Sequence, residues 1–286
     1  MTVIENCSFD EERAFYGEKG ITVKHCAFDG PADGESAFKE CSDINAEDCF
    51  FNLRYPFWHD RGVKIIGSEM TENCRAALWY SEHITVRETK MHGIKALREC
   101  DGVIINDCDI LSPEFGWSAR NIQMSDCSAV SEYFLLRAEN ILLDNVRFSG
   151  KYSFQYIKNA LIENCELTTK DAFWHAENVT VKNCVLNGEY LGWYSNGLTL
   201  INCKITGTQP LCYCKNLKLV DCEMFNTDLS FEKSEVEAEI ITPIVSVKNP
   251  AAGIISAPAF GEIISDDPKA TGKTAITERD LYKAAT

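Results

Sequence analysis

A short internal repeat constrains the fold of this chain more than any other feature. Similar eight-residue segments recur at 21–28, 103–110, 179–186 and 217–224. One position in each segment, named the anchor here, is usually Cys and recurs in twelve copies: Cys7, Cys26, Cys49, Ser68, Thr89, Cys108, Cys127, Val146, Cys165, Cys184, Cys203 and Cys222. The sequence numbers of successive anchors differ by 19, 23, 19 and 21, and then by 19 seven times. So regular and short a period is typical of a solenoid in which each copy forms one coil.

Within each copy, apolar residues alternate with polar ones, as they do in a strand with one buried face. In one copy, the apolar side consists of Val179, Val181, Cys184 and Leu186. Gly or Asn stands six residues before most anchors, and Asn or Asp stands one residue before them. These residues accept left-handed backbone, so both positions predict sharp corners. Three short strands and three corners leave no room for a helix in each coil, and the pattern therefore predicts an all-β parallel β-helix of about twelve coils.

The repeat fades near residue 234, which divides the chain into two expected parts. We expect the parallel β-helix to span 1–234 and residues 235–286 to form an irregular C-terminal cap or tail, because the open end of a β-helix has to be covered. No comparable segment stands before the first coil. We therefore also expect that the chain could form a homo-oligomer through this uncovered N-terminal coil.

Nine of the fourteen cysteines occupy the anchor position, where a small inward side chain fits. Ser68, Thr89 and Val146 replace Cys at the same position, which favours packing over redox chemistry. The pair Cys212 and Cys214 has no His or Cys partner at ligand spacing, so no metal site is predicted there. The cysteines are therefore expected to be reduced thiols inside the coils.

Charge and the absence of apolar runs disfavour several classes of partner. The chain has 43 Asp and Glu residues against 28 Lys and Arg residues, a net charge of −15. This excess disfavours nucleic acid or an anionic membrane surface as a partner. No run of 18 apolar residues encodes a membrane span, and the first residues lack the basic and apolar regions of a secretory signal. Together with the reduced thiols, these features predict an acidic cytoplasmic protein.

The strand that ends seven residues before each anchor holds the residues most informative about function. All five tryptophans stand ten residues before an anchor, and four of them are followed by His or Tyr. Charged residues occupy the same two positions in other coils, so we expect both positions to point outward, as at a β-bulge; inward packing of the tryptophans is the alternative. Sugar rings stack on exposed aromatic faces, which predicts a carbohydrate or small glycoconjugate as the ligand. The candidate ligand-binding residues are Trp58, His59, Trp79, Tyr80, Trp117, Tyr156, Trp174, His175, Trp193 and Tyr194.

Three longer runs carry a resemblance to a known family. PFWHDRGVKI (56–65), KDAFWHAENVTVKNC (170–184) and GEYLGWYSNGLTLINCKITGTQPLCYCKNL (188–217) resemble an uncharacterised bacterial family, domain of unknown function 3737. The coil pattern resembles the single-stranded right-handed β-helices of the pectin-lyase-like superfamily. The resemblance implies the fold and its right-handedness, and it implies no established activity. In the wider superfamily the substrate groove lies on the sheet before the first of the two corners, which here is the strand with the tryptophans.

Four charged residues on neighbouring coils form the candidate catalytic group: Glu82, Arg98, Glu99 and Asp101. A carboxylate cluster with arginine could bind Ca²⁺ and support the proton abstraction of a lyase; the alternative is an ordinary solvated row of charges. Hydrolysis of a glycoside needs two carboxyl groups about 5 to 9.5 Å apart, and the motifs of the superfamily's galacturonan hydrolases are absent. Activity as a carbohydrate-active lyase or hydrolase is therefore left open, and no cofactor other than Ca²⁺ comes into consideration.

Two functions agree with the sequence. The first is a protein that binds a carbohydrate along the aromatic strip, with or without modifying it. The second is a non-catalytic scaffold or protein-interaction module that uses the same face. Binding to a glycan array with and without Ca²⁺ would distinguish between them.

Overall fold

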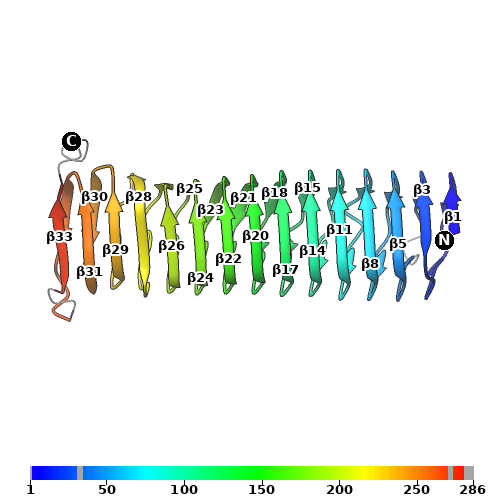
Figure 1. Cartoon of the computed structure of the whole chain (residues 1–286), viewed down its shortest axis with the longest axis horizontal. Helices are drawn as coiled ribbons and strands as arrows, with labels where there is room; N and C mark the ends of the chain where they lie inside the picture. The colour runs from blue at the N-terminus through cyan, green and yellow to red at the C-terminus, as the bar shows by residue number, and fades with distance from the viewer. Residues whose placement is uncertain (1, 31–34, 270–272, 280–286) are drawn as a thin grey trace. The chain divides into compact units, whose positions relative to one another are not determined.

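The protein is a right-handed parallel β-helix of about 14 turns (Figure 1). The computed structural model describes residues 2–30, 35–269 and 273–279, and every regular element in these ranges is a β-strand. These ranges hold no helix with the length and apolar character that crossing a membrane requires. The chain falls into two compact units, Met1–Phe148 and Ser149–Thr286, which are described in turn.

The first unit is built from two or three strands per coil. The longest strands form one parallel sheet of β1 (Thr2–Glu5), β3 (Ile21–Lys24), β5 (Ser42–Glu47), β8 (Arg61–Ile66), β11 (Glu82–Arg87), β14 (Asp101–Asn106), β17 (Arg120–Ser125) and β20 (Glu139–Asp144). A second sheet holds β2 (Ser8–Phe9), β4 (Ala27–Phe28), β6 (Phe50–Phe51), β9 (Glu69–Met70), β12 (Lys90–Met91), β15 (Asp109–Leu111) and β18 (Ser128–Ser131). The third, short strands are β7 (Phe57–Trp58), β10 (Leu78–Trp79), β13 (Leu97–Arg98), β16 (Glu114–Phe115) and β19 (Tyr133–Phe134). Pairing is in register, as between Val86 and Ile105, so equivalent positions of successive coils lie side by side.

The second unit repeats the two longer strands of each coil. One sheet holds β22 (Lys158–Glu163), β24 (Glu177–Lys182), β26 (Asn196–Ile201), β28 (Leu217–Phe225), β29 (Glu235–Ile240), β31 (Ala252–Ala257) and β33 (Thr274–Glu278). The other strands are β23 (Glu166–Lys170), β25 (Val185–Asn187), β27 (Lys204–Thr206), β30 (Ile244–Lys248) and β32 (Phe260–Ile264), while β21 (Arg147–Lys151) crosses the boundary of the two units in the sequence.

Parallel pairing continues beyond the last anchor, so the structure has about 14 turns where the anchors indicate twelve. Val236 of β29 pairs with Gly253 of β31, and Ile255 of β31 pairs with Ile276 of β33. These coils carry no Cys anchor, and the step from Val236 to Gly253 is shorter than the anchor period, so a search for that period misses them. Residues 235–278 therefore hold strands of the solenoid, and their role as a cap stays a prediction.

Left-handed backbone occurs at both corner positions predicted from the sequence. In one coil, φ is 54° at Asn178 and 53° at Asn183. A third left-handed position, nine residues before the anchor, was not expected, because it holds large side chains such as His59 and Tyr194, both with φ of 60°. This position shapes the candidate site described below.

Phenylalanine side chains stacked along the coils fill much of the core. Phe38 and Phe57 stack at 5.2 Å between ring centroids in the first unit, and Phe154 and Phe173 stack at 4.8 Å in the second. All four are fully buried. They stand eleven residues before an anchor, the position that the alternation places inside.

The anchor side chains do more than fill space, because they bind the backbone at a corner. Cys184 donates its thiol hydrogen to the carbonyl of Lys182 at 3.1 Å, and its sulfur accepts the backbone N–H of Cys165 at 3.2 Å. Ser68 makes the corresponding bonds with Ile66 and Cys49. Each of the fourteen cysteines is a free thiol, and all but Cys7 are buried. A small donor that can also accept explains why Cys and Ser exchange at the anchor.

Candidate functional site

Two neighbouring positions of each coil differ in exposure, although the sequence predicted that both point outward. We name the position ten residues before the anchor the stack column and the position nine residues before it the ring column. The five tryptophans of the stack column are half-buried, whereas His59, Tyr80, Tyr156, His175 and Tyr194 of the ring column are exposed. The left-handed backbone in the ring column interrupts the strand alternation, so its side chains turn outward beside those of the stack column.

In the first unit, cations and indoles alternate along the stack column. The Lys39 ammonium lies 4.3 Å from the centroid of Trp58, and Trp58 stacks on Trp79 at 5.7 Å with an interplanar angle of 13°. Arg98 follows, with its guanidinium carbon 5.7 Å from Trp79 and 5.2 Å from Trp117. Cation–π contacts of this kind hold the charges without burying them fully. The charged residues that suggested an outward stack column are thus part of a half-buried row.

In the second unit, the stack column contains one pair of indoles, each bound to the backbone. Trp174 and Trp193 stack at 5.4 Å with an interplanar angle of 5°. The Trp174 indole N–H donates to the carbonyl of Tyr190 at 2.8 Å, and that of Trp193 donates to the carbonyl of Gln209 at 2.8 Å. The facing sides of the two indoles therefore cover each other, and their N–H groups are occupied within the protein. These residues support the neighbouring column.

Four stacked rings follow one another in the ring column of the second unit, of which Tyr156, His175 and Tyr194 are exposed and Tyr213 is half-buried. Tyr156 and His175 stack at 4.9 Å, His175 and Tyr194 at 5.0 Å, and Tyr194 and Tyr213 at 4.9 Å, with interplanar angles between 8° and 14°. Tyr156 is 44% exposed and Tyr194 is 45% exposed. Rings stacked in this way present their edges to solvent. We name these four residues the ring row.

Sequence reasoning missed Tyr213, because the residue before it is Cys212 rather than a tryptophan. Its place nine residues before the anchor Cys222 was the available signal. Burial and the nearby Glu232 raise the pKa of Tyr213 above its ordinary value. The hydroxyl therefore stays protonated at neutral pH and can both donate and accept a hydrogen bond.

The first unit has a shorter ring pair between two carboxylates. His59 and Tyr80 stack at 5.0 Å with an interplanar angle of 23°. Glu40 and Glu99 hold the same column on the coils before and after them. Glu40 accepts a hydrogen bond from the Tyr16 hydroxyl at 2.9 Å, and Arg98 Nε lies 3.0 Å from Glu99 Oε1. Both carboxylates thus have partners within the protein.

The structure brings the candidate catalytic residues onto adjacent coils and gives each carboxylate a cation. Glu82 and Asp101 are paired in register in β11 and β14. Asp101 Oδ2 lies 3.3 Å from Arg120 Nη2, and Glu82 Oε2 lies 4.0 Å from Arg61 Nε. In the part of the chain that the structure describes, no three His, Cys, Asp or Glu side chains are placed to hold a metal ion. The catalytic roles of Glu82, Arg98, Glu99 and Asp101 stay a prediction.

A buried carboxyl that the sequence analysis did not single out lies beside the ring pair of the first unit. Asp60 is 1% exposed, and its Oδ1 accepts the backbone N–H of Cys41 at 2.7 Å. Its Oδ2 is buried and has no partner among the described residues. Burial raises the pKa of Asp60 to about 8, and the charge of Glu40 acts in the same direction. The signal was a charged residue eight positions before an anchor, where most other coils have small residues.

Solved structures with a similar fold share little sequence with this chain. PfbA, a surface adhesin of Streptococcus pneumoniae, is 11% identical, with 88% of this chain and 71% of that chain covered and a TM-score of 0.34. A double mutant of the periplasmic alginate epimerase AlgG is 9% identical, with 97% and 72% covered and a TM-score of 0.37. The catalytic domain of a GH87 alpha-1,3-glucanase in complex with nigerose is 9% identical, with 91% and 64% covered and a TM-score of 0.32.

No curated protein matches the sequence. The profile of one protein family, described as protein of unknown function (DUF3737), matches residues 2–277. The match extends over nearly the whole chain, and the chain therefore belongs to the DUF3737 family.

Proposed function

We propose that this protein binds a carbohydrate chain lengthwise along the ring row. The observation that carries the proposal is the row itself: four rings stacked at 4.9–5.0 Å on successive coils, three of them exposed and each with left-handed backbone. Left-handed backbone costs a residue other than Gly roughly 1–2 kcal/mol. At the two predicted corners, the chain lowers that cost with Gly, Asn or Asp, but in the ring row it has Tyr and His.

The spacing of the row fits a polymer of sugar units. A saccharide chain offers hydroxyl groups at intervals close to the length of one pyranose ring, which is near the coil spacing of about 4.8 Å. Tyr hydroxyls and imidazole nitrogens both donate and accept hydrogen bonds, as sugar hydroxyls do. Binding would therefore use the ring edges, rather than the indole faces predicted from the sequence.

The half-buried tryptophans would support the ring row from below. Trp174 and Trp193 are held by their stacking and by bonds to the backbone carbonyls of Tyr190 and Gln209. A fixed support lowers the entropy lost when a flexible chain binds to the rings above it. The same arrangement requires no metal ion and no catalytic residue in the ring row.

A glycan array followed by calorimetry tests the proposal. Substitutions Tyr194→Phe and Tyr213→Phe keep the stacked rings and remove only the hydroxyls, so each should weaken binding about fivefold, as the loss of one hydrogen bond does. Tyr190→Phe is the matched control, because Tyr190 lies in the same unit outside the ring row. Retained affinity in both ring-row variants, or no glycan bound at all, would contradict the proposal. Self-association through this face would instead support the scaffold function.

A further inference from the structure

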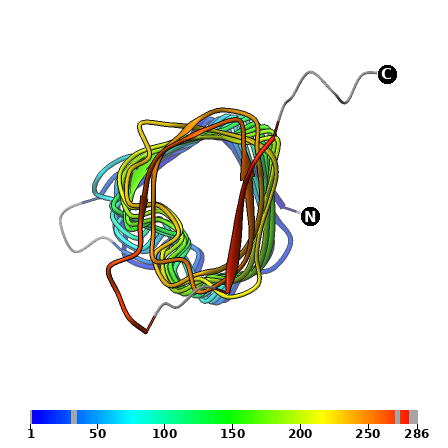
Figure 2. The same ribbon diagram turned by 90° about the vertical axis from the view of Figure 1, so that its left-hand side faces the viewer.

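The ring row ends at a wall formed by a later part of the second unit. Lys233, with a left-handed φ of 54°, holds the next place in the ring column, and the pairing of Glu235 with Ala252 puts Pro250 in the place after it, directly following Asn249. Tyr194 is 45% exposed, whereas Pro250 in the column and Asn249 beside it are buried, Asn249 to 3% exposure. The segment after β32 covers Asn249. In Figure 2, this red part of the chain extends outward from the neighbouring coils.

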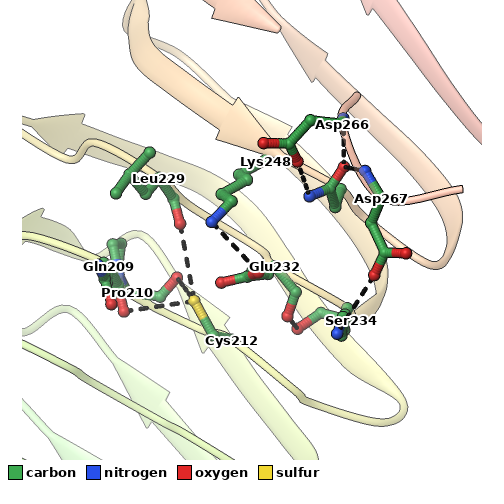
Figure 3. A network of polar contacts seen from close by, with 11 residues as sticks. Gln209, Pro210, Cys212, Leu229, Glu232, Ser234, Lys248, Asp266 and Asp267 are labelled. Atoms are coloured by element: carbon green, nitrogen blue, oxygen red, sulfur yellow. Dashed lines mark hydrogen bonds and ion pairs between the residues drawn. The ribbon is translucent and has the colours of Figure 1, made fainter. Parts of the chain in front are cut away.

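The wall is fixed by hydrogen bonds between a single buried amide and the residues Asp266 and Asp267, which are labelled in Figure 3. Asn249 Oδ1 accepts the backbone N–H groups of Asp266 at 3.1 Å and of Asp267 at 3.2 Å. Asn249 Nδ2 donates to Asp266 Oδ1 at 2.7 Å. Both hydrogen bonds that Asn249 Oδ1 accepts thus come from the covering segment, and they hold this segment close over Asn249.

Charged groups form the side of the wall that faces the rings. Lys233 Nζ lies 3.3 Å from Asp267 Oδ2, directly after Tyr213 in the column. Lys248 Nζ lies 3.4 Å from Glu232 Oε1, also drawn in Figure 3. The aromatic surface is thus followed by two ion pairs, which offer both donors and acceptors where the row stops.

We infer that the ring row recognises the end of a carbohydrate chain and not an internal stretch of it. A chain lying along the rings from Tyr156 to Tyr213 meets the covered coil of Asn249 and Pro250 and cannot continue in the same line. Its terminal unit lies at Lys233 and Asp267, where the extra hydroxyl of a chain end finds an ammonium donor and a carboxylate acceptor. This inference rests on the proposed function and adds which part of the ligand is bound.

Binding stoichiometry on long chains distinguishes the inference from the function on which it rests. Linear cello-, xylo-, malto- and laminari-oligosaccharides of two to eight units are titrated first, followed by the polymer of whichever series binds. End recognition predicts an affinity that stops rising once the row is filled, and one bound protein per polymer chain at any length. Bound protein that increases in proportion to polymer length would overturn the inference and leave carbohydrate binding intact. If neither these oligosaccharides nor the glycan array yield a ligand, the proposed function itself is wrong.

A charge variant tests the contact at the wall. Asp267→Asn removes the ion pair with Lys233 and leaves an oxygen that can still accept the backbone N–H of Lys269, which Asp267 Oδ1 binds at 2.9 Å. We expect about fivefold weaker binding of the best oligosaccharide. Lys182→Met is the matched control, because it breaks the 3.2 Å pair with Glu163 elsewhere in the same unit. Equal affinities of Asp267→Asn and Lys182→Met would contradict a terminal contact at this position.

Discussion

The guanidinium of Arg98 lies 5.2 Å from the centroid of the Trp117 indole, on the coil that follows. The same guanidinium lies 5.7 Å from Trp79 on the coil before, and its Nε is bound to Glu99 at 3.0 Å. Arg98 thus links three coils of the first unit. These contacts give it a structural role independent of any chemistry.

Replacement of Arg98 should therefore lower stability. We expect Arg98→Ala to reduce the free energy of unfolding by about 1–2 kcal/mol, because two cation–π contacts and a charged hydrogen bond are lost. Thermal unfolding followed by circular dichroism measures the change. Arg120→Ala is the control, since the Arg120 side chain is 61% exposed and its ion pair with Asp101 is expected to contribute little. An equal effect of both substitutions would speak against the stacked arrangement.

Asp60 makes stability depend on pH. Burial raises its pKa to about 8 from an ordinary value of 3.8, so between these pH values the folded chain binds the proton more tightly than the unfolded chain does. The contribution of Asp60 to the free energy of unfolding is fully present below about pH 4, declines as pH rises, and is lost above about pH 8. Asp60→Asn should lack this decline, which is on the order of several kcal/mol. Urea unfolding at pH 5 and pH 9 measures it, and parallel profiles for both proteins would contradict the assignment.

The anchor cysteines should tolerate serine better than a side chain without a donor. Cys184→Ser keeps both a donor for the Lys182 carbonyl and an acceptor for the Cys165 N–H, whereas Cys184→Ala removes both. We expect Cys184→Ala to cost about 2–3 kcal/mol, for the buried polar groups left without partners and the lost volume, and Cys184→Ser to cost less. The unfolding midpoints of the two variants show which of them is more stable. A more stable alanine variant would show that packing alone selects the anchor residue.

The half-buried tryptophans should be quenched only in part by acrylamide. Indoles that cover each other, as Trp58 with Trp79 and Trp174 with Trp193, expose an edge but not both faces. We expect a Stern–Volmer slope clearly below that of the urea-unfolded protein and above zero. A slope equal to that of the unfolded chain would indicate an open strip, and a slope near zero would indicate core residues.

Periodicity predicted the fold well, because the coil is a local unit that repeats. The apolar alternation at Val179 and Val181 and the corners at Asn178 and Asn183 each depend on a few adjacent residues, and all were read from the sequence. The coils after residue 234 were not, since their steps of 17 and 21 residues depart from the anchor period and they lack the anchor. Pairing with the preceding coil, such as that of Gly253 with Val236, supplies what their own pattern does not show.

The candidate site was less predictable, because it depends on a conformation that its residues do not favour. Nothing in Tyr194 or His175 indicates left-handed backbone, which Gly or Asn would adopt more readily. Without it, strand alternation could not decide which of Trp193 and Tyr194 faces outward. The wall at Asn249 could not be predicted either, since it depends on contacts with Asp266 and Asp267 from the next coil.

The uniform spacing of the coils that carry the ring row gives the surface a modular length. Anchors from Cys165 to Cys222 follow one another at a constant interval in the sequence, and every coil contributes one ring at the same place. Duplication of one such repeat in the gene would therefore add one ring in line with its neighbours. The rings between the new repeat and the wall would keep their distances from the wall. The length of carbohydrate chain that this surface can accommodate would thus change by one coil at a time. Related proteins could then bind chains of different length while each coil keeps the same contacts.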